Sequence, residues 1–92
     1  MGTFHHDKGE LHGITVVVDT HGPRVFVGRC DTVTPQGVVL LDGDVHEAGP
    51  DGPTKEAWVA KAAKVGVWPS FDREIVPGDD VASIRRLGDV RP

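Results

Sequence analysis

Short runs of β-branched residues, separated by turn signals rich in glycine and proline, constrain the fold of this chain most strongly. The run ITVVVD begins at Ile14 and alternates so that Ile14, Val16 and Val18 share one face, which is typical of a strand. It ends at the tetrapeptide THGP, where glycine tolerates a positive φ and proline removes a hydrogen-bond donor. We therefore expect a hairpin at the start of a mostly β domain.

The next two runs extend the same pattern. A second strand is expected over Arg24–Asp31, with Phe26 and Cys30 on one face and Gly28 marking a bend or a bulge. The turn TPQG then precedes VVLLD, a third strand that is apolar on both faces apart from its last residue. We expect Cys30 to be a small buried hydrophobic residue rather than a reactive thiol.

A helix is expected in the middle of the chain. Thr54 is suited to cap a helix over Lys55–Val65, and Gly66 is suited to end it. The turn-rich stretch DGDVHEAGPDGP before it should be an exposed connection, so residues 43–69 form a loop–helix insertion. Both tryptophans, including Trp68, are expected to anchor this insertion to the core. The apolar stripe of the helix should consist of Trp58, Ala62 and Val65.

Two short strands are expected near the C-terminus, at about Arg73–Val76 and Asp80–Leu87, joined by a tight Pro-Gly turn. Residues 1–12 show no sustained period and are interpreted as a loose arm. The 92 residues fit a single domain, because domains commonly need about 50 to 200 residues. A core of this size is small, which favours further burial between subunits.

The charge balance argues against a nucleic-acid-binding surface that covers the whole molecule. Ten lysine and arginine residues stand against fourteen aspartate and glutamate residues, a net charge of −4. Binding of nucleic acid would therefore need a local basic patch. The single cysteine excludes an internal disulfide, and no apolar run suggests a signal peptide or a membrane span. We expect a cytoplasmic protein with no membrane partner.

Two stretches, GRCDTVTPQGVVLLDGDVHE from Gly28 and REIVPGDDVASI from Arg73, resemble the two halves of the Sm/LSm signature. The resemblance implies a mostly β fold, a five-stranded Sm-like (SH3-like) small barrel, here with one short helix inserted between strands 3 and 4. It also implies a homo-oligomer that forms through the fourth and fifth strands. The D-x-D-V-H segment followed by a T-K-E helix start is similar to small bacterial proteins, which points to a bacterial branch.

In Sm proteins an RNA base is gripped by an Asp and an Asn before the third strand and by an Arg at the second-motif turn. Asp31 matches the Asp, but Gly37 stands where the Asn is expected and Pro77 stands where the Arg is expected. Glycine offers only backbone, and proline has neither a charge nor an N–H, so the uridine pocket is mostly absent. RNA binding would instead use a basic rim. The candidate RNA-binding residues are the arginines of this rim, Arg24, Arg29, Arg85 and Arg86, together with Asp31.

A candidate metal site lies where the third strand ends. Asp42, Asp44 and His46 would share one face if that strand continued, with Glu47 beside them. Carboxylate and imidazole ligands suit a divalent ion such as Zn²⁺ or Mn²⁺. The alternative interpretation is an acidic, solvated strand end that leads into a loop.

Three functions remain open from the sequence. The first is a non-enzymatic Sm-like module without a cofactor, which self-associates and binds a partner whose identity the residues do not give. The second is an RNA-binding ring that uses the basic rim. The third is a metal-binding domain centred on the D-G-D-V-H segment. No catalytic motif of a hydrolase and no phosphate-binding loop is present in the sequence, so an enzyme is not expected.

Overall fold

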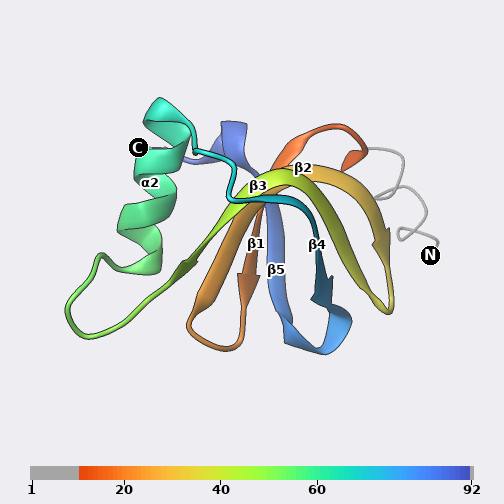
Figure 1. Cartoon of the computed structure of the whole chain (residues 1–92), viewed down its shortest axis with the longest axis horizontal. Helices are drawn as coiled ribbons and strands as arrows, with labels where there is room; N and C mark the ends of the chain where they lie inside the picture. Colours follow the sequence, from red (N-terminus) through yellow and green to blue (C-terminus); the bar gives the residue numbers. More distant parts are fainter. Residues whose placement is uncertain (1–10, 92) are drawn as a thin grey trace.

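The computed structural model describes residues 11–91 and shows a strongly bent five-stranded sheet with one α-helix at its side (Figure 1). The predicted arm, residues 1–12, falls almost wholly outside the described residues. The elements in chain order are β1 (Thr15–Thr20), β2 (Arg24–Thr34), β3 (Gly37–Glu47), α2 (Lys55–Val65), β4 (Phe71–Pro77), the 3₁₀ turn η1 (Gly78–Asp80), β5 (Val81–Arg86) and the 3₁₀ turn η2 (Leu87–Asp89).

The strands form one antiparallel sheet in the order β4-β3-β2-β1-β5. This confirms the predicted fold class, with five strands and one short helix between the third and fourth. The sheet curves as a barrel wall does, but it is open, because β4 and β5 lie at its two edges and are not paired with each other. Each edge strand therefore has one side that no other strand of the described chain covers.

The third strand is longer than predicted. It was expected to end at Asp42, but it continues to Glu47 and pairs with the start of β2, from Arg24↔Glu47 to Val27↔Asp44. The prediction of an exposed connection was therefore wrong for residues 43–47. The Asp42-Gly43 pair, which is typical of a turn, bends the strand without ending it, since Asp42 adopts a φ of 50° and stays within the strand.

Gly28 and Gly43 allow the paired strands β2 and β3 to lie very close to each other at this bend. The pairing register shifts between Val27 and Arg29, which confirms the bulge predicted at Gly28. A Cβ added at Gly43 would overlap the carbonyl oxygen of Val27 and the ring of Phe71. There is no room for a side chain at position 43, so a glycine is needed there. The close approach of β2 and β3 at this point lets the sheet fold over its own core.

Two apolar clusters hold the domain together. The inner cluster lies within the bend of the sheet and consists of Val16, Val18, Phe26, Cys30, Val38, Leu40 and Val76, all buried. The helix-side cluster lies on the other face and consists of Val17, Val25, Val27, Val59 and Ala62, all buried. The alternation predicted for the first two strands is confirmed, because successive valines of β1 enter different clusters.

The helix has the predicted bounds and caps. The Thr54 hydroxyl accepts a hydrogen bond from the backbone N–H of Ala57 at 3.1 Å, and Gly66 ends the helix with a φ of 81°. Its buried stripe differs from the prediction, since Val59 and Ala62 face the sheet while Val65 is 67% exposed. Among the described residues no helix is long and apolar enough to cross a membrane.

The two tryptophans have different surroundings. Trp58 packs against the helix-side cluster and stacks on His46, with ring centroids 5.5 Å apart. This agrees with its predicted role as an anchor. Trp68 is 90% exposed, so the same prediction was wrong for this residue. The neighbouring Val67 packs against the helix-side cluster instead, and Trp68 lines a shallow cavity beside the end of the helix with Trp58 and Lys61.

Candidate functional site

The predicted basic residues of β2 are already engaged by acidic residues of β3. The Nε atom of Arg24 lies 3.6 Å from a carboxylate oxygen of Glu47. A guanidinium nitrogen of Arg29 donates to Asp42 at 2.8 Å. Both pairs are well exposed to solvent, so each contributes little to stability, but each offsets the positive charge that a phosphate would meet.

The predicted basic residues of β5 lie on opposite faces of the sheet. Arg85 is opposite Val17 of the helix-side cluster, whereas Arg86 is opposite Val16 of the inner cluster. Both are exposed, and neither forms an ion pair with another residue of the described range 11–91. The structure therefore does not bring the four arginines together on one face.

Two of the positions that match the RNA-contact residues of Sm proteins meet at one end of the sheet. Gly37 and Pro77 are direct partners in the β3–β4 ladder, and Gly78 donates its backbone N–H to the carbonyl of Gln36 at 2.9 Å. Asp31 lies on β2 and accepts a hydrogen bond from the Thr32 hydroxyl at 3.1 Å. Neither Gly37 nor Pro77 supplies a polar side chain at this end of the ladder.

The three residues of the candidate metal site have separate contacts. Asp42 pairs with Arg29, and the Oδ1 atom of Asp44 accepts from the hydroxyl of Ser70 at 2.7 Å. The Nε2 atom of His46 lies 2.8 Å from the carbonyl oxygen of Pro53. Within residues 11–91 no three histidine, cysteine or acidic side chains gather as metal ligands. A metal at this segment stays a prediction of the sequence.

The helix is fastened to the sheet by a lysine. The ammonium group of Lys55 donates to a carboxylate oxygen of Asp19 at 2.7 Å and to the carbonyls of Thr20 and Gly22 at 2.9 and 2.6 Å. Its side chain is only 24% exposed, so these bonds form largely out of water. The sequence showed Lys55 as a first-turn residue of a helix, and nothing in it indicated this contact with the β1–β2 turn.

Cys30 is buried in the inner cluster, as predicted. Burial raises the pKa of its thiol, and the negative charge of the neighbouring Asp31 raises that pKa further. A thiol kept protonated in an apolar cluster is a poor nucleophile. The packing therefore supports the structural role of Cys30.

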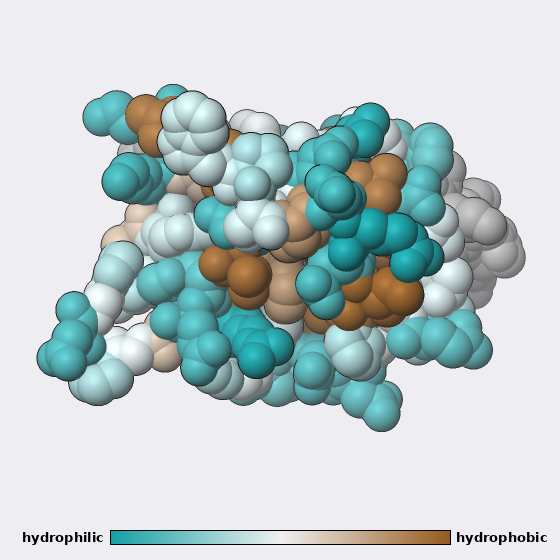
Figure 2. Space-filling view, viewed as in Figure 1, coloured by the Kyte–Doolittle hydropathy of each residue, from teal (hydrophilic) through white to brown (hydrophobic). Residues whose placement is uncertain are grey.

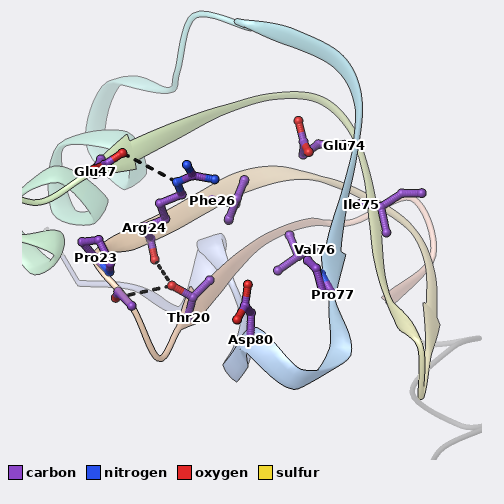
Figure 3. A pocket seen from close by; sticks show the side chains of 11 residues that line it. Thr20, Pro23, Arg24, Phe26, Glu47, Glu74, Ile75, Val76, Pro77 and Asp80 are labelled. Carbon is purple, nitrogen blue, oxygen red and sulfur yellow. Dashed lines mark hydrogen bonds and ion pairs between the residues drawn. The ribbon is translucent and has the colours of Figure 1, made fainter.

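A cavity of 490 Å³ runs along β4 (Figure 3). Four successive residues of that strand, Glu74 to Pro77, line one side, and the β1–β2 turn lines the other. Figure 3 shows Glu74 and Val76 on the cavity side of the strand and Ile75 pointing away from it. The lining residues come from β1, β2, β3, β4 and η1, so no local sequence pattern indicated the cavity.

Apolar side chains are exposed beside this cavity and at the end of the helix. Ile75 of the edge strand β4 is 48% exposed, and Figure 2 shows brown apolar surface among polar residues on the face that it draws. Single exposed apolar residues are common, but one on an edge strand adds to the open backbone groups of that edge. The structure thus presents two open strand edges, one of them with an apolar residue.

Searches with family models and against curated proteins gave no match to this chain. Comparison with solved structures did find similar proteins. The Sm protein of Pyrococcus abyssii, solved in complex with a uridine heptamer, superposes with a TM-score of 0.58 at 19% identity, covering 85% of this chain and 89% of that chain.

The chain has an Sm-like fold. A chain of the NatC complex bound to CoA is also similar, with a TM-score of 0.55 at 18% identity over 85% of this chain and 80% of that one. At such identities the Sm-like similarity concerns the fold alone. One fold serves in proteins with different partners, so function has to be argued from the residues of this chain.

Proposed function

We propose that this chain is a non-enzymatic Sm-like module that self-associates edge to edge and binds its partner on the assembled surface. The observation that carries the proposal is the open sheet, in which β4 and β5 each leave one side uncovered by the described chain. Open strand edges pair readily with other strands. Because the two edges belong to different strands, repeated pairing is head to tail and closes into a ring if the rotation allows.

Size and composition support the same proposal. The inner cluster contains seven buried residues, which is a small core, and association would bury more apolar surface. Ile75 lies half exposed on β4, where a neighbouring strand would cover it. None of the clusters described above assembles a nucleophile with a base, which is in keeping with a role in binding.

Light scattering of the full chain, coupled to size-exclusion chromatography, tests self-association. We expect a mass of several subunits for the wild type and a shift toward the monomer for Ile75→Asp, because a carboxylate on the edge strand would have to be desolvated. Val65→Asp is the control, since Val65 is also an exposed aliphatic residue but lies on α2 rather than on an edge strand. Equal masses for wild type and I75D would remove β4 from the interface.

RNA binding is the second candidate function. It is supported by the exposure of Arg85 and Arg86, which have no acidic partner in the described range, and by symmetry, since an assembly repeats each of them in every subunit. Arg24 and Arg29 support RNA binding less, because each already forms an ion pair with an acidic residue of β3.

Fluorescence anisotropy with labelled oligo-U, oligo-A and duplex probes tests this candidate. We expect binding at about 50 mM salt that weakens steeply toward about 200 mM, because phosphate contacts release counterions. Replacing Arg85 and Arg86 together by Gln should lower the affinity more than replacing Lys61 and Lys64 together by Gln, a matched change on the helix. No binding of any probe at the lower salt concentration would rule the candidate out.

A further inference from the structure

We propose that one side of α2, together with Trp68 beside it, is a docking surface for an acidic peptide segment of another protein, which seats one apolar side chain between Trp58 and Trp68. We call this the tryptophan surface, and it consists of Trp58, Lys61, Lys64, Val65 and Trp68. The inference rests on the binding role in the proposed function and deepens it, because it names the chemical class of the partner. It does not depend on self-association.

The apolar side of α2 is wider than the part that the sheet covers. Val59 and Ala62 are buried against the sheet, and Trp58 is half-buried at the border of this face. Val65 follows Trp58 by seven residues, about two turns, and therefore lies on the same side of the helix. It is nevertheless 67% exposed. Part of the apolar side of α2 thus stays in contact with water.

Trp68 extends this exposed apolar surface and is held in place by its neighbours. The preceding Val67 packs against the helix-side cluster. Gly66 donates its backbone N–H to the last turn of α2 at 2.8 Å, and Ser70 donates its own to the carbonyl of Gly43 in β3 at 2.7 Å. The short segment that carries Trp68 is therefore fastened at both ends. A side chain presented in this way costs little ordering when a partner binds.

A cavity of 200 Å³ lies at this surface, with Trp58, Trp68, Lys61 and Asp44 in its wall. Sites for small molecules usually have volumes of about 300 to 1,000 Å³, so this cavity suits a single inserted side chain better than a whole small molecule. Figure 2 shows brown apolar surface bordered by teal hydrophilic residues at the corner of the molecule where α2 ends. The shape thus favours a larger partner that inserts one apolar anchor.

The charges at this surface select the partner. Lys61 and Lys64 lie one turn apart on α2 and are exposed, and neither forms an ion pair with another residue of the range 11–91. The acidic residue in the cavity wall, Asp44, directs one carboxylate oxygen to the hydroxyl of Ser70 at 2.7 Å and to the N–H of Val45 at 2.8 Å. Carboxylates beside an apolar anchor would complement the two lysines.

A peptide suits the tryptophan surface better than a nucleic acid does. A strand of RNA can also stack on an exposed tryptophan, but it carries a phosphate at every nucleotide and needs positive charge along its path. The tryptophan surface contains two lysines, and the chain as a whole has a net charge of −4. A short acidic segment places its charges beside the lysines alone. Tryptophan is also a frequent anchor at protein–protein interfaces.

Selection of phage-displayed random peptides on the full chain tests the class of partner. We expect the selected peptides to carry an aliphatic or aromatic residue flanked by aspartate and glutamate. Trp68→Ala should bind these peptides at least about tenfold more weakly than the wild type does, because it removes the anchor of the surface. Failure to select any peptide, selection of basic peptides, or equal binding by W68A would each overturn the proposal.

Fluorescence anisotropy with the tightest acidic peptide tests the two lysines. Replacing Lys61 and Lys64 together by Glu should weaken binding at least about tenfold, because attraction becomes repulsion. Replacing Arg85 and Arg86 together by Glu makes the same change of net charge on β5 and should have a much smaller effect, since salt screens distant charges. Equal losses in the two double variants would show a response to net charge alone and would overturn the proposal.

Tryptophan emission tests where the peptide binds. Trp58→Phe keeps an aromatic ring beside His46 and leaves Trp68 as the one tryptophan of the chain. Addition of the acidic peptide to this variant should shift the emission of Trp68 to shorter wavelength and protect it from quenching by acrylamide, because the exposed ring becomes covered. Ile75→Ala, which truncates an exposed apolar residue of β4, is the control for Trp68→Ala in the binding measurement. Unchanged emission at saturating peptide would contradict the proposed position.

The other outcomes identify other occupants or separate the two proposals. Oligo-U that binds through Trp68 and excludes the acidic peptide would make RNA the occupant, and a lower mass of W68A in light scattering would make it a second copy. Either result would overturn the peptide proposal. A monomeric wild type that binds the peptide through Trp68 would overturn self-association alone. Circular dichroism checks that each variant retains its fold, which we expect because Trp68, Lys61 and Lys64 are exposed.

Discussion

The two apolar clusters of this sheet are completed in different ways. The helix-side cluster is covered within the chain, because α2 supplies Val59 and Ala62 and is fastened by Lys55. The inner cluster relies on the bend of the sheet, and a cavity of 490 Å³ remains beside it along the edge strand β4. The helix α2 thus covers one face of the sheet, whereas the border of the other face stays open. We propose that a second copy binds at this border.

The largest effect that tests this comparison is expected from Leu40, which is fully buried in the inner cluster. Leu40→Ala should lower the free energy of unfolding by about 2 to 5 kcal/mol, because it removes buried methylene groups and leaves a void. Leu41→Ala is the matched control, since the neighbouring leucine is only half-buried and should cost less. Urea titration of both variants measures the difference, and equal losses would contradict the placement of the inner cluster.

A smaller and more local effect is expected at the attachment of the helix. Lys55→Met keeps an unbranched side chain but removes the ammonium group and its three hydrogen bonds, so it should destabilise the protein by about 1 to 2 kcal/mol. Hydrogen exchange should quicken in α2 and leave the amides of β2 and β3 protected. Lys61→Met, at an exposed position of the same helix, should change neither. Uniform quickening across the sheet would show that the helix is not a separately attached unit.

The smallest effect concerns Cys30 of the inner cluster, whose thiol pKa is raised in the folded state by burial and then by Asp31. Below the pKa of the unfolded thiol, about 8.5, both states hold the proton and pH has no effect through this group. Above it the unfolded state loses the proton first, so stability falls as the pH rises toward the folded pKa. The urea midpoint should therefore fall more between about pH 8 and 10 for the wild type than for Cys30→Ala. Parallel profiles would rule out this contribution.

Local signals predicted the elements well. The caps Thr54 and Gly66 define the helix, because they act within one turn of chain. The alternation of β1 and the bulge at Gly28 were also predictable, since a strand shows its two faces in its sequence. The extension of β3 through Asp42 and Gly43 could not be predicted, because these two residue types favour turns. Only the close packing of Gly43 against β2 shows why they lie in a strand.

The candidate site depended on the pairing register, which the sequence does not show. Arg85 and Arg86 were expected to form one basic spot, yet their ladder partners place them on different faces. The inward positions of Glu74 and Arg86 follow from their ladder partners, which lie far away in the chain. The resemblance predicted the fold correctly, whereas the positions of the RNA pocket have become Gly37 and Pro77.

Native mass spectrometry of the full-length wild type over a dilution series tests the central claim most directly. We expect one defined multiple of the chain mass that gives way to the monomer on dilution, because the proposed contact pairs the open edges of β4 and β5 between copies. A single species with the mass of one chain at every concentration would contradict it.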